Sequence, residues 1–416
     1  MVEVFGLINT IQDYAWGSRT AIPELLGESS PADKPQAELW MGAHPKAPST
    51  VLLEEGGQLP LPELVAQDPA GTLGATVAQR FSSRLPFLFK VLAAALPLSI
   101  QAHPNLEQAR EGFRRENELG IPLDAFQRNY RDANHKPEVI SALTPFWALN
   151  GFRPIPEMLD LLHSIGFPSI SEHLDTFRKN PDSAGLKIFF AALMRLDRKT
   201  RGRAIEEAVH WARGQLNQEQ RSGTAGGETP EIPTTPIARW LVRLQELYPG
   251  DIGVLSPLLL NLILLQPGDT MFLEAGLLHA YLEGMGIELM ANSDNVIRGG
   301  LTPKHKDLEE LLSILRFEGK AVRLAEALET VPGERVFQTP AEEFRLAEIR
   351  VQPDTPYTSP KTGSIELMIC LDGEGAIDAV DPLPLSKGDS LMIPASTSPY
   401  TIHGQLRLFK AFVPLD

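Results

Sequence analysis

The sequence predicts a mainly β fold with an α-helical insertion, on the basis of three observations. A Gly-Asp turn that opens an apolar strand occurs at 268–275 and again at 388–395, so the pattern repeats after 120 residues. Apolar residues recur at helical spacing between Ile155 and about Leu216. A chain of 416 residues with 43% apolar content is long enough for two or three domains with buried cores.

Composition restricts the class of partner and the compartment. The formal net charge of -15 argues against binding to nucleic acid or to anionic membranes. Cys370 is the only cysteine, and its apolar neighbours predict a buried thiol in a reducing compartment. The N-terminus does not resemble a signal peptide, and the apolar run 85–100 is too short to cross a bilayer. We therefore expect a soluble, cytoplasmic protein, which we take to be a monomer.

Local patterns predict the individual elements in chain order. Leu92 to Ile100 is apolar and predicts a buried strand, whereas the charged stretch Leu106 to Asn129 predicts a solvated helix. The polar stretch Glu219 to Pro236 is rich in turn formers and predicts a mobile loop. Further helices are expected at Ile155 to about Leu216, at Ile237 to Tyr248 and at Asp307 to Leu315.

Four residues distributed along the chain suit a metal site. Gln101 and His103 leave the same face of an extended segment because they are two positions apart. Glu138 follows a proline that disfavours helix, and His279 follows the first Gly-Asp turn. Two histidines, a glutamate and a glutamine carbonyl suit zinc and leave a position open for water or substrate, which is typical of catalytic sites. A lone histidine is more often a core or surface residue, so the interpretation depends on the whole set.

The segment 288–304 is a second concentration of polar groups. It contains Glu288, Asp294 and Arg298 next to two glycines, and it has no helical or alternating apolar period. One interpretation is a solvated loop. The other is a ligand-binding segment, because glycine lets a ligand approach the backbone closely.

Several short motifs occur in a fixed order along nearly the whole chain. They are Tyr14-Ala15-Trp16-Gly17, Glu38 to Pro45, Pro86 to Lys90, Gln101 to Pro104, His135 to Glu138, Gly276 to Tyr281 and Asn292 to Lys304. In this order they resemble the motifs of the type I mannose-6-phosphate isomerases, a family of zinc enzymes with a cupin core.

The resemblance implies a role for each matched residue. The implied ligands of one zinc ion per chain are Gln101, His103, Glu138 and His279. The implied catalytic residues are Arg298, Lys136, Glu288, Asp294 and His135. The implied substrate-binding residues are Trp16, Lys90, Ser99, Tyr281 and Lys304.

Among these residues, the resemblance makes Lys90 and Lys304 candidates for contacts to the phosphate of a sugar phosphate. Two positions depart from the family pattern. Leu278 stands where proline is usual before the histidine, and Leu106 replaces a common lysine, which removes one possible basic contact.

The repeat and the resemblance together predict two cupin-like jelly-roll barrels and a helical domain. We expect a catalytic cupin domain at 1–152 and 251–320, a helical insertion at 153–250 and a second barrel at 321–416. The first copy of the repeat places His279 eleven residues after its glycine, whereas the second copy has Pro399 there. Because proline cannot bind a metal, only the first barrel is expected to be catalytic.

The implied reaction interconverts mannose 6-phosphate and fructose 6-phosphate through an enediolate. Arg298 is expected to stabilise the developing charge, while Lys136, Glu288 or Asp294 transfer protons. Nearby cations favour the neutral, basic form of a lysine, which favours Lys136 as the base, with His135 or Asp294 assisting ring opening. One alternative is a non-catalytic cupin that binds a sugar phosphate. Another is an iron oxygenase, whose sites favour histidine-rich or two-histidine, one-carboxylate ligand sets.

Overall fold

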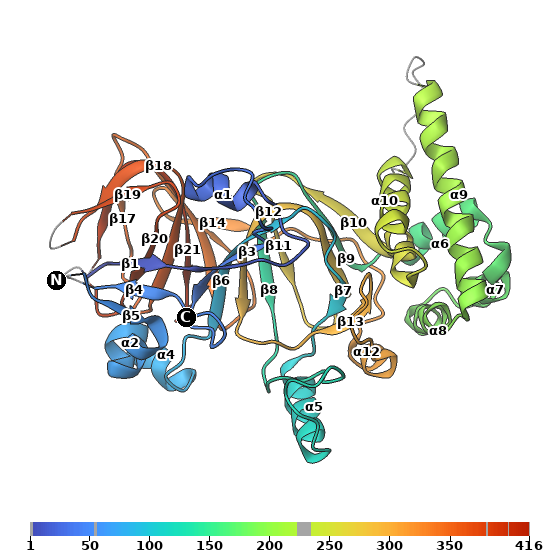
Figure 1. Cartoon of the computed structure of the whole chain (residues 1–416), viewed down its shortest axis with the longest axis horizontal. Helices are drawn as coiled ribbons and strands as arrows, with labels where there is room; N and C mark the ends of the chain where they lie inside the picture. The colour runs from blue at the N-terminus through green and yellow to red at the C-terminus, as the bar shows by residue number, and fades with distance from the viewer. Residues whose placement is uncertain (1–2, 54–55, 223–233, 380–381, 398, 416) are drawn as a thin grey trace.

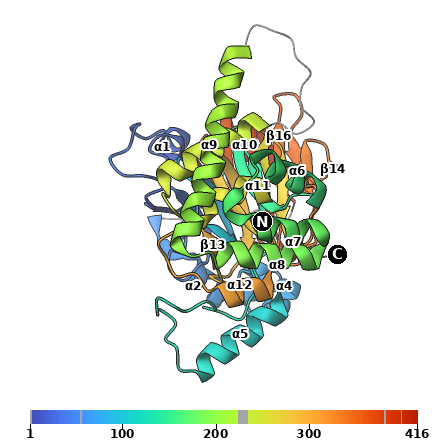
Figure 2. The ribbon, with the colours of Figure 1, turned by 90° about the vertical axis from the view of Figure 1, so that its right-hand side faces the viewer.

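The computed structural model describes residues 3–53, 56–222, 234–379, 382–397 and 399–415. Two large antiparallel sheets lie side by side, and a group of helices covers one end of the molecule (Figure 1). Figure 2 views this end and shows helices α6 to α10 in front of the sheets. The predicted mainly β class with a helical insertion is confirmed.

The first sheet contains ten strands and carries the predicted metal ligands. Its strands are β2 (Thr10–Gln12), β3 (Glu38–Gly42), β6 (Phe87–Ala94), β7 (Ile100–Ala102), β8 (Glu138–Ala142), β9 (Phe146–Phe152), β10 (Leu260–Leu265), β11 (Thr270–Leu273), β12 (His279–Ala291) and β13 (Ile297–Gly300). The predicted strand 92–100 is wrong, because β6 ends at Ala94 and the N–H groups of Ala95 and Leu96 turn to the carbonyl of Trp16.

Strand β12 joins two layers of this sheet. Its first part, 279–283, pairs with β7 and β9, and its second part, 284–291, pairs with β6 and β8. The change of layer occurs at Gly284, where φ is +132° and a Cβ atom would lie 2.7 Å from the ring of Phe146. Only glycine fits this position without strain. One strand therefore supplies side chains to both layers.

The second sheet contains eleven strands. Its strands from the C-terminal part of the chain are β14 (Ala327–Val331), β15 (Glu334–Phe337), β16 (Arg345–Val351), β17 (Tyr357–Thr358), β18 (Glu366–Ile377), β19 (Leu383–Ser386), β20 (Ser390–Ile393) and β21 (Thr401–Phe412). The N-terminal part adds β1 (Phe5–Ile8), β4 (Thr50–Leu52) and β5 (Gln58–Pro60). The predicted boundary at 1–152 therefore does not follow the sheets.

The turns of the predicted repeat have the same geometry. Gly268 and Gly388 have φ angles of +95° and +94°. In each copy, the carboxylate of Asp269 or Asp389 accepts a hydrogen bond of 2.8 Å from the backbone N–H three residues earlier. Each turn then leads into a strand, β11 or β20, so the internal repeat read from the sequence is confirmed. In the second copy, Pro399 is exposed outside the strands.

Half of the described α-helices lie between β9 and β10 in the chain. They are α6 (Ile155–Ile165), α7 (Ser171–Lys179), α8 (Ser183–Met194), α9 (Arg198–Ser222), α10 (Thr234–Leu247) and α11 (Ser256–Leu259), with short 3₁₀ turns at Pro168–Ile170 and Ile252–Leu255. Helices α6 to α10 form the predicted insertion, and the predicted loop 219–236 falls largely at 223–233, outside the described residues.

The remaining helices lie beside the sheets. They are α1 (Ala21–Leu26), α2 (Leu61–Gln67), α3 (Pro69–Leu73), α4 (Ala75–Arg80), α5 (Leu106–Glu118) and α12 (Leu308–Ile314). Helix α5 projects from the lower edge of the first sheet (Figure 1). No described helix combines the length and the apolar composition that a membrane span requires.

A continuous apolar core joins the two sheets. Phe89 of β6 and Leu289 of β12 belong to the same buried cluster as Leu367 of β18 and Phe409 of β21. Full burial of each such side chain stabilises the fold by about 1.5–3 kcal/mol. The second sheet thus supports the outer face of the layer that carries Glu288, and the two sheets cannot separate without exposing this core.

Candidate metal centre and active site

The predicted ligands come from both layers of the first sheet. In one layer, Gln101 of β7 lies directly opposite His279 on one side and Arg298 on the other. Directly opposed residues of antiparallel strands share a face, with Cβ atoms about 4.5–5.5 Å apart. In the other layer, β8 begins with Glu138, next to Met290 of β12. Gln101, His279 and Arg298 therefore share one face of the first layer, and His279 on this face reaches Glu138 of the second layer.

Three of the predicted ligands converge closely. His103 Nε2 lies 3.5 Å from Glu138 Oε1, and His279 Nε2 lies 3.4 Å from Glu138 Oε2. All three side chains are buried. Among the described residues, this is the only group of three histidine, cysteine or acidic side chains with the mutual spacing of metal ligands.

The two histidine rings present their free nitrogens to the same space. His103 Nδ1 lies 2.7 Å from the carbonyl of Asn295, and His279 Nδ1 lies 3.0 Å from the carbonyl of Leu277. Because a carbonyl only accepts hydrogen bonds, each Nδ1 carries the proton and each Nε2 keeps a lone pair. His103 Nε2, His279 Nε2 and Glu138 Oε2 are buried and make no hydrogen bond. Such orphaned acceptors are costly unless a cation binds them.

The separations of these atoms fit zinc. Zinc bonds of about 2.0–2.2 Å to nitrogen and oxygen place tetrahedral ligand atoms roughly 3.4 Å apart, close to the distances of 3.5 and 3.4 Å observed here. The side chain of Gln101 lies on the same face as that of His279, because the two residues are directly opposite each other. The residues present therefore suit one zinc ion.

The charge of the buried groups also suits a divalent cation. Burial opposes ionisation of Glu138, but the ammonium group of Lys136, 2.8 Å from Oε1, and the imidazole of His103 outweigh it, so the pKa of Glu138 lies well below its usual range. Burial, with a smaller effect of Lys136, lowers the pKa of His103 to about 4. Near neutral pH both side chains are thus in their metal-binding forms.

Glu288 and Lys90 form a second buried group. Lys90 Nζ lies 2.8 Å from Glu288 and 3.5 Å from Glu38, whose carboxylate also accepts a hydrogen bond of 2.7 Å from the indole of Trp40. Burial opposes the charge of Lys90, but its two carboxylate partners outweigh burial and raise its pKa. One ammonium group cannot fully compensate two carboxylates. Burial, and repulsion from Glu138 and Glu38, accordingly raise the pKa of Glu288.

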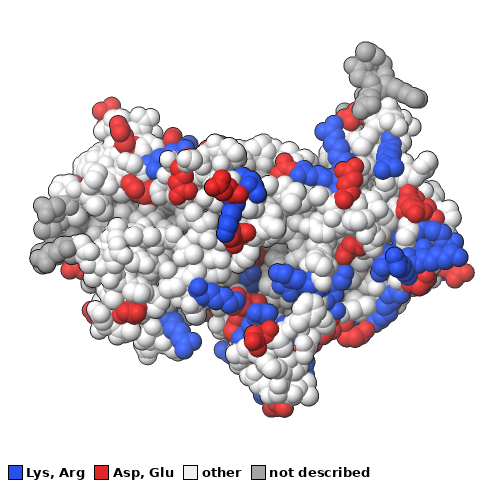
Figure 3. Space-filling model, in the orientation of Figure 1, with Lys and Arg blue, Asp and Glu red and all other residues white. Residues whose placement is uncertain are grey.

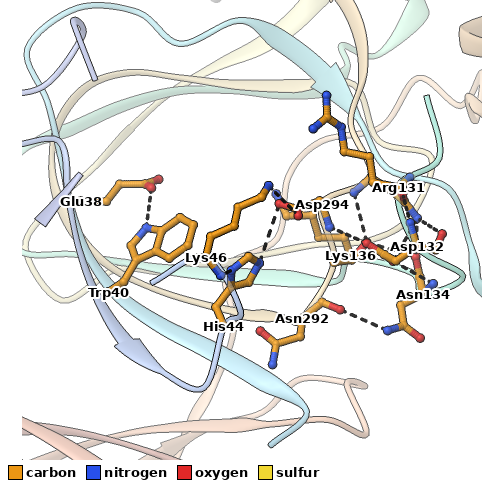
Figure 4. Close-up of polar contacts among 12 residues, drawn as sticks. Glu38, Trp40, His44, Lys46, Arg131, Asp132, Asn134, Lys136, Asn292 and Asp294 are labelled. Carbon is orange, nitrogen blue, oxygen red and sulfur yellow. Dashed lines mark hydrogen bonds and ion pairs between the residues drawn. The ribbon is translucent and has the colours of Figure 1, made fainter. Parts of the chain in front are cut away.

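Asp294 lies in a different surrounding, shown in Figure 4. Its carboxylate is 2.7 Å from the ammonium group of Lys46 and 3.8 Å from Nε2 of His44. Burial opposes its charge, but Lys46 outweighs this effect and lowers the pKa of Asp294. Burial lowers the pKa of His44 as well. Asp294 is therefore held in its ionised form.

His135 does not join the other predicted catalytic residues. Its Nε2 lies 2.6 Å from the carboxylate of Glu343, on the loop between β15 and β16 of the second sheet. The residue thus connects the two sheets. Its neighbour Lys136 faces Glu138 instead, because successive side chains of an extended segment point to opposite sides.

The predicted substrate-binding residues occupy buried, partly buried and exposed positions. Tyr281 is on the face of β12 that carries His279, and burial, with the nearby Glu288 carboxylate, raises its pKa. Trp16 packs against the small core that includes Tyr281. Ser99 directly precedes β7 on the side of Gln101, whereas Lys304 is exposed beyond β13.

Several residues of the site had no predicted role. Glu38, Trp40 and His44 lie inside one of the quoted motifs, so the motif was the available signal. Asn295 is fully buried and binds the segment 131–134 through its side chain, with a hydrogen bond of 2.7 Å from the N–H of Arg131. It lies inside the motif Asn292 to Lys304, so a motif was the available signal here too.

The adjacent glycines at 299 and 300 have another explanation than ligand approach. A Cβ atom at Gly300 would lie 2.9 Å from the Cα atom of Gly253, and one at Gly299 would lie 3.2 Å from Leu278. These glycines let β13 pack against its protein neighbours.

Comparisons with known proteins agree with this geometry. Residues 4–155 match the model of the type I phosphomannose isomerase catalytic domain, and residues 334–413 match that of the mannose-6-phosphate isomerase cupin domain. The chain is 41% identical over 414 residues to the mannose-6-phosphate isomerase of Escherichia coli (strain K12), covering 98% of each chain. It is 34% identical over 421 residues to that of Homo sapiens, covering 95% of this chain and 94% of the human protein.

Solved structures show the same similarity. A crystal structure of a mutant phosphomannose isomerase from Salmonella typhimurium has a TM-score of 0.88 at 37% identity, covering 99% of this chain and 100% of the other. A zinc-bound crystal structure of mannose 6-phosphate isomerase has a TM-score of 0.87 at 38% identity with the same coverage. Both the predicted resemblance and the predicted zinc-binding character of the site are confirmed. The chain belongs to the type I phosphomannose isomerase family.

Proposed function

We propose that this chain is a zinc-dependent isomerase that interconverts mannose 6-phosphate and fructose 6-phosphate. The observation that carries the proposal is the buried group of His103, Glu138 and His279, whose free ligand atoms converge beside Lys136. We assign the zinc ion to these three side chains and Gln101. When bound there, zinc would polarise substrate oxygens as a Lewis acid and so make the adjacent carbon more acidic.

Arg298 is proposed to stabilise the enediolate. Its strand position places it next to Gln101, and therefore beside the ligand set, and no carboxylate is paired with it among the described residues. A guanidinium stays protonated while negative charge develops on the substrate. Because the positive charge is fixed before the reaction, it stabilises the intermediate without a reorganisation cost.

Two buried groups are proposed to move protons. Lys136, whose Nζ is 2.8 Å from the ligand Glu138, removes the proton from one substrate carbon and returns it to the neighbouring carbon. A second proton must pass between the two substrate oxygens. Glu288 suits this transfer, because its raised pKa lets it hold and release a proton closer to neutral pH than an ordinary carboxyl group does.

The surroundings of Asp294 and Lys90 support positioning roles. Asp294 is held ionised by Lys46, so we assign it to orientation of the substrate hydroxyls and ring opening rather than to removal of the carbon proton. Lys90 is buried and paired with Glu288 and Glu38, which favours a role in orienting Glu288 over a contact to phosphate. We further propose that the enzyme acts as a cytoplasmic monomer with a sugar phosphate, and not a nucleic acid or a membrane, as its partner.

The test is conversion of mannose 6-phosphate to fructose 6-phosphate by the purified chain, before chelation, after chelation and after addition of zinc. We expect activity that chelation abolishes and zinc restores. A folded, zinc-loaded protein that binds the sugar phosphate without converting it would support the alternative of a non-catalytic cupin.

A further inference from the structure

Three basic side chains gather beside the metal centre without an acidic partner. They are Arg131, Arg298 and Lys304, and none of them forms an ion pair in the described part of the chain. The positive charges of the other lysines of the site are compensated by ion pairs. Lys46, Lys90 and Lys136 each contact a carboxylate within 2.8 Å. The three unpaired cations therefore form a distinct group.

Two hydrogen bonds hold the segment that carries Arg131 against the segment that carries Arg298 and Lys304. The N–H of Arg131 donates to Asn295 Oδ1 over 2.7 Å, three residues before Arg298. Two residues before Arg131, the side chain of Asn129 donates to Asp307 over 2.9 Å, three residues after Lys304. The segment 129–131 consequently runs along the segment 295–307.

The side chain of Arg131 is free to bind a ligand. Its guanidinium extends away from the carboxylate of Asp132, which is occupied by the N–H of Asp294 at 2.7 Å and the hydroxyl of Ser293 at 2.9 Å (Figure 4). Arg131 is exposed, whereas its backbone is anchored through the fully buried Asn295. The fixed backbone distinguishes it from an arginine on a mobile surface loop.

The three positive charges repel one another, which disfavours the protonated forms of Arg298 and Lys304. Burial lowers the pKa of Arg298, and Arg131 lowers it further. Partial burial lowers the pKa of Lys304 as well, and the charges of Arg298 and Arg131 lower it further. Repulsion of this kind is relieved when an anion binds between the cations, and a phosphate group offers two negative charges and several acceptors to guanidinium forks.

The rest of the molecule does not supply this attraction. The net charge is -15, and acidic and basic side chains are intermixed over the face shown in Figure 3. An anionic substrate must therefore be attracted locally.

We propose that Arg131 is a phosphate-binding and specificity-determining residue that, together with Lys304, holds the anionic end of the substrate next to Arg298. The proposal rests on the sugar-phosphate isomerase function proposed above. Arg131 has no role in proton transfer, because a guanidinium stays protonated near neutral pH. It selects phosphorylated over unphosphorylated sugars and contributes mainly to KM.

The experiment compares zinc-loaded wild-type enzyme with Arg131→Gln, Arg131→Lys and Arg110→Gln. Arg110 is an exposed arginine of α5 that has no ionic partner among the described residues, so its variant controls for the loss of one charge. KM and kcat are measured with mannose 6-phosphate and with unphosphorylated mannose, and the affinity for inorganic phosphate is measured by titration calorimetry. Zinc content is determined for every variant.

We expect Arg131→Gln to raise KM for mannose 6-phosphate roughly 10- to 100-fold and to weaken phosphate binding similarly, as the loss of a hydrogen-bonded charge pair implies. The kcat value, the turnover of mannose and the zinc content should stay within about threefold of wild type. Arg131→Lys should keep most of the affinity, and Arg110→Gln should match wild type.

Two results would overturn the proposal. One is an unchanged KM and phosphate affinity in Arg131→Gln. The other is an equal loss with mannose and mannose 6-phosphate, which would mean that the change acts through the Asn295 segment. If the wild-type enzyme converts no hexose phosphate at all, the proposed function fails, while the phosphate titration still decides the role of Arg131.

Discussion

At the scale of single residues, the site is prepared for a metal before the metal arrives. Two backbone carbonyls fix the tautomers of His103 and His279, and Lys136 keeps Glu138 ionised. None of these three supporting contacts adds a ligand atom. Each instead removes a rearrangement or a protonation change that binding would otherwise require.

The ligand and charge-stabilising roles are separable by mutation. His279→Ala and Glu138→Ala each remove one ligand atom from a set without a spare, so both variants should lose zinc and activity together. Arg298→Ala leaves the ligand set complete and should retain zinc while kcat falls by roughly two to three orders of magnitude. Zinc content by atomic emission and steady-state kinetics check this. An active, zinc-free His279→Ala enzyme would contradict the assignment.

The burial of Lys90 has an energetic consequence. Lys90→Met leaves Glu288 and Glu38 buried without their shared cation, and breaking such a pair costs about 3–5 kcal/mol. We expect a corresponding loss in the free energy of urea unfolding, with part of it recovered in Lys90→Met/Glu288→Gln. If Lys90 acted only as a phosphate contact, Lys90→Met would change KM and leave the unfolding free energy near that of wild type.

At the scale of elements, predictions succeeded where a local pattern decided the outcome. The repeated Gly-Asp turns were recognisable because their residues alone determine the turn, and the helices 155–216 follow from apolar spacing. Predictions failed where a distant partner decided. The break in the strand 92–100 depends on the carbonyl of Trp16, and the change of layer in β12 depends on Phe146 beside Gly284. The four predicted ligands were recognised only because the motifs were considered as a set.

The two copies of the turn offer a matched comparison of strain. Gly268→Ala and Gly388→Ala both place a side chain at positive φ, which costs about 1–2 kcal/mol. A Cβ atom at Gly268 meets open space, whereas one at Gly388 lies 2.9 Å from the carbonyl oxygen of Leu25. We expect Gly388→Ala to lose about 1–3 kcal/mol more, by thermal or urea unfolding. Equal losses would show that the backbone near Leu25 moves aside freely.

At the scale of the whole molecule, the two sheets behave as one structural unit. They share an apolar core, and three N-terminal strands belong to the sheet formed mainly by the C-terminal part of the chain. His135, predicted as a catalytic residue, instead contacts Glu343 across this boundary. Its motif indicated the correct region of the chain but could not show which way the ring turns, since that depends on a residue 208 positions away.

The contact between His135 and Glu343 makes stability depend on pH. Burial opposes ionisation of Glu343, but the hydrogen bond and charge of His135 outweigh it and lower the pKa of Glu343 below its ordinary value of about 4.3. A lowered carboxyl pKa stabilises the folded state above that ordinary value, and this contribution is lost as pH falls through the folded-state pKa.

Glu343→Gln should therefore reduce the free energy of unfolding by about 1 kcal/mol at pH 7. The difference from wild type should persist above the ordinary carboxyl pKa of about 4.3 and disappear as the pH falls through the lower folded-state pKa of Glu343. Urea unfolding at several pH values measures it, with zinc content as a check that the metal site is intact. A difference that stays constant from pH 7 to pH 3.5 would exclude this carboxylate as its source.

Strand β12 also has a consequence for the order of folding. It places His279 against Gln101 and Glu288 against Lys90, contacts that join parts of the chain up to 198 positions apart. A polypeptide that is still being synthesised therefore has no complete ligand set until β12 has left the ribosome and paired with its partner strands. Pairing between such distant parts of the chain is slow. Zinc should accordingly bind only at the end of folding. The appearance of bound metal can then serve as a kinetic signal that β12 has paired with both layers of the first sheet.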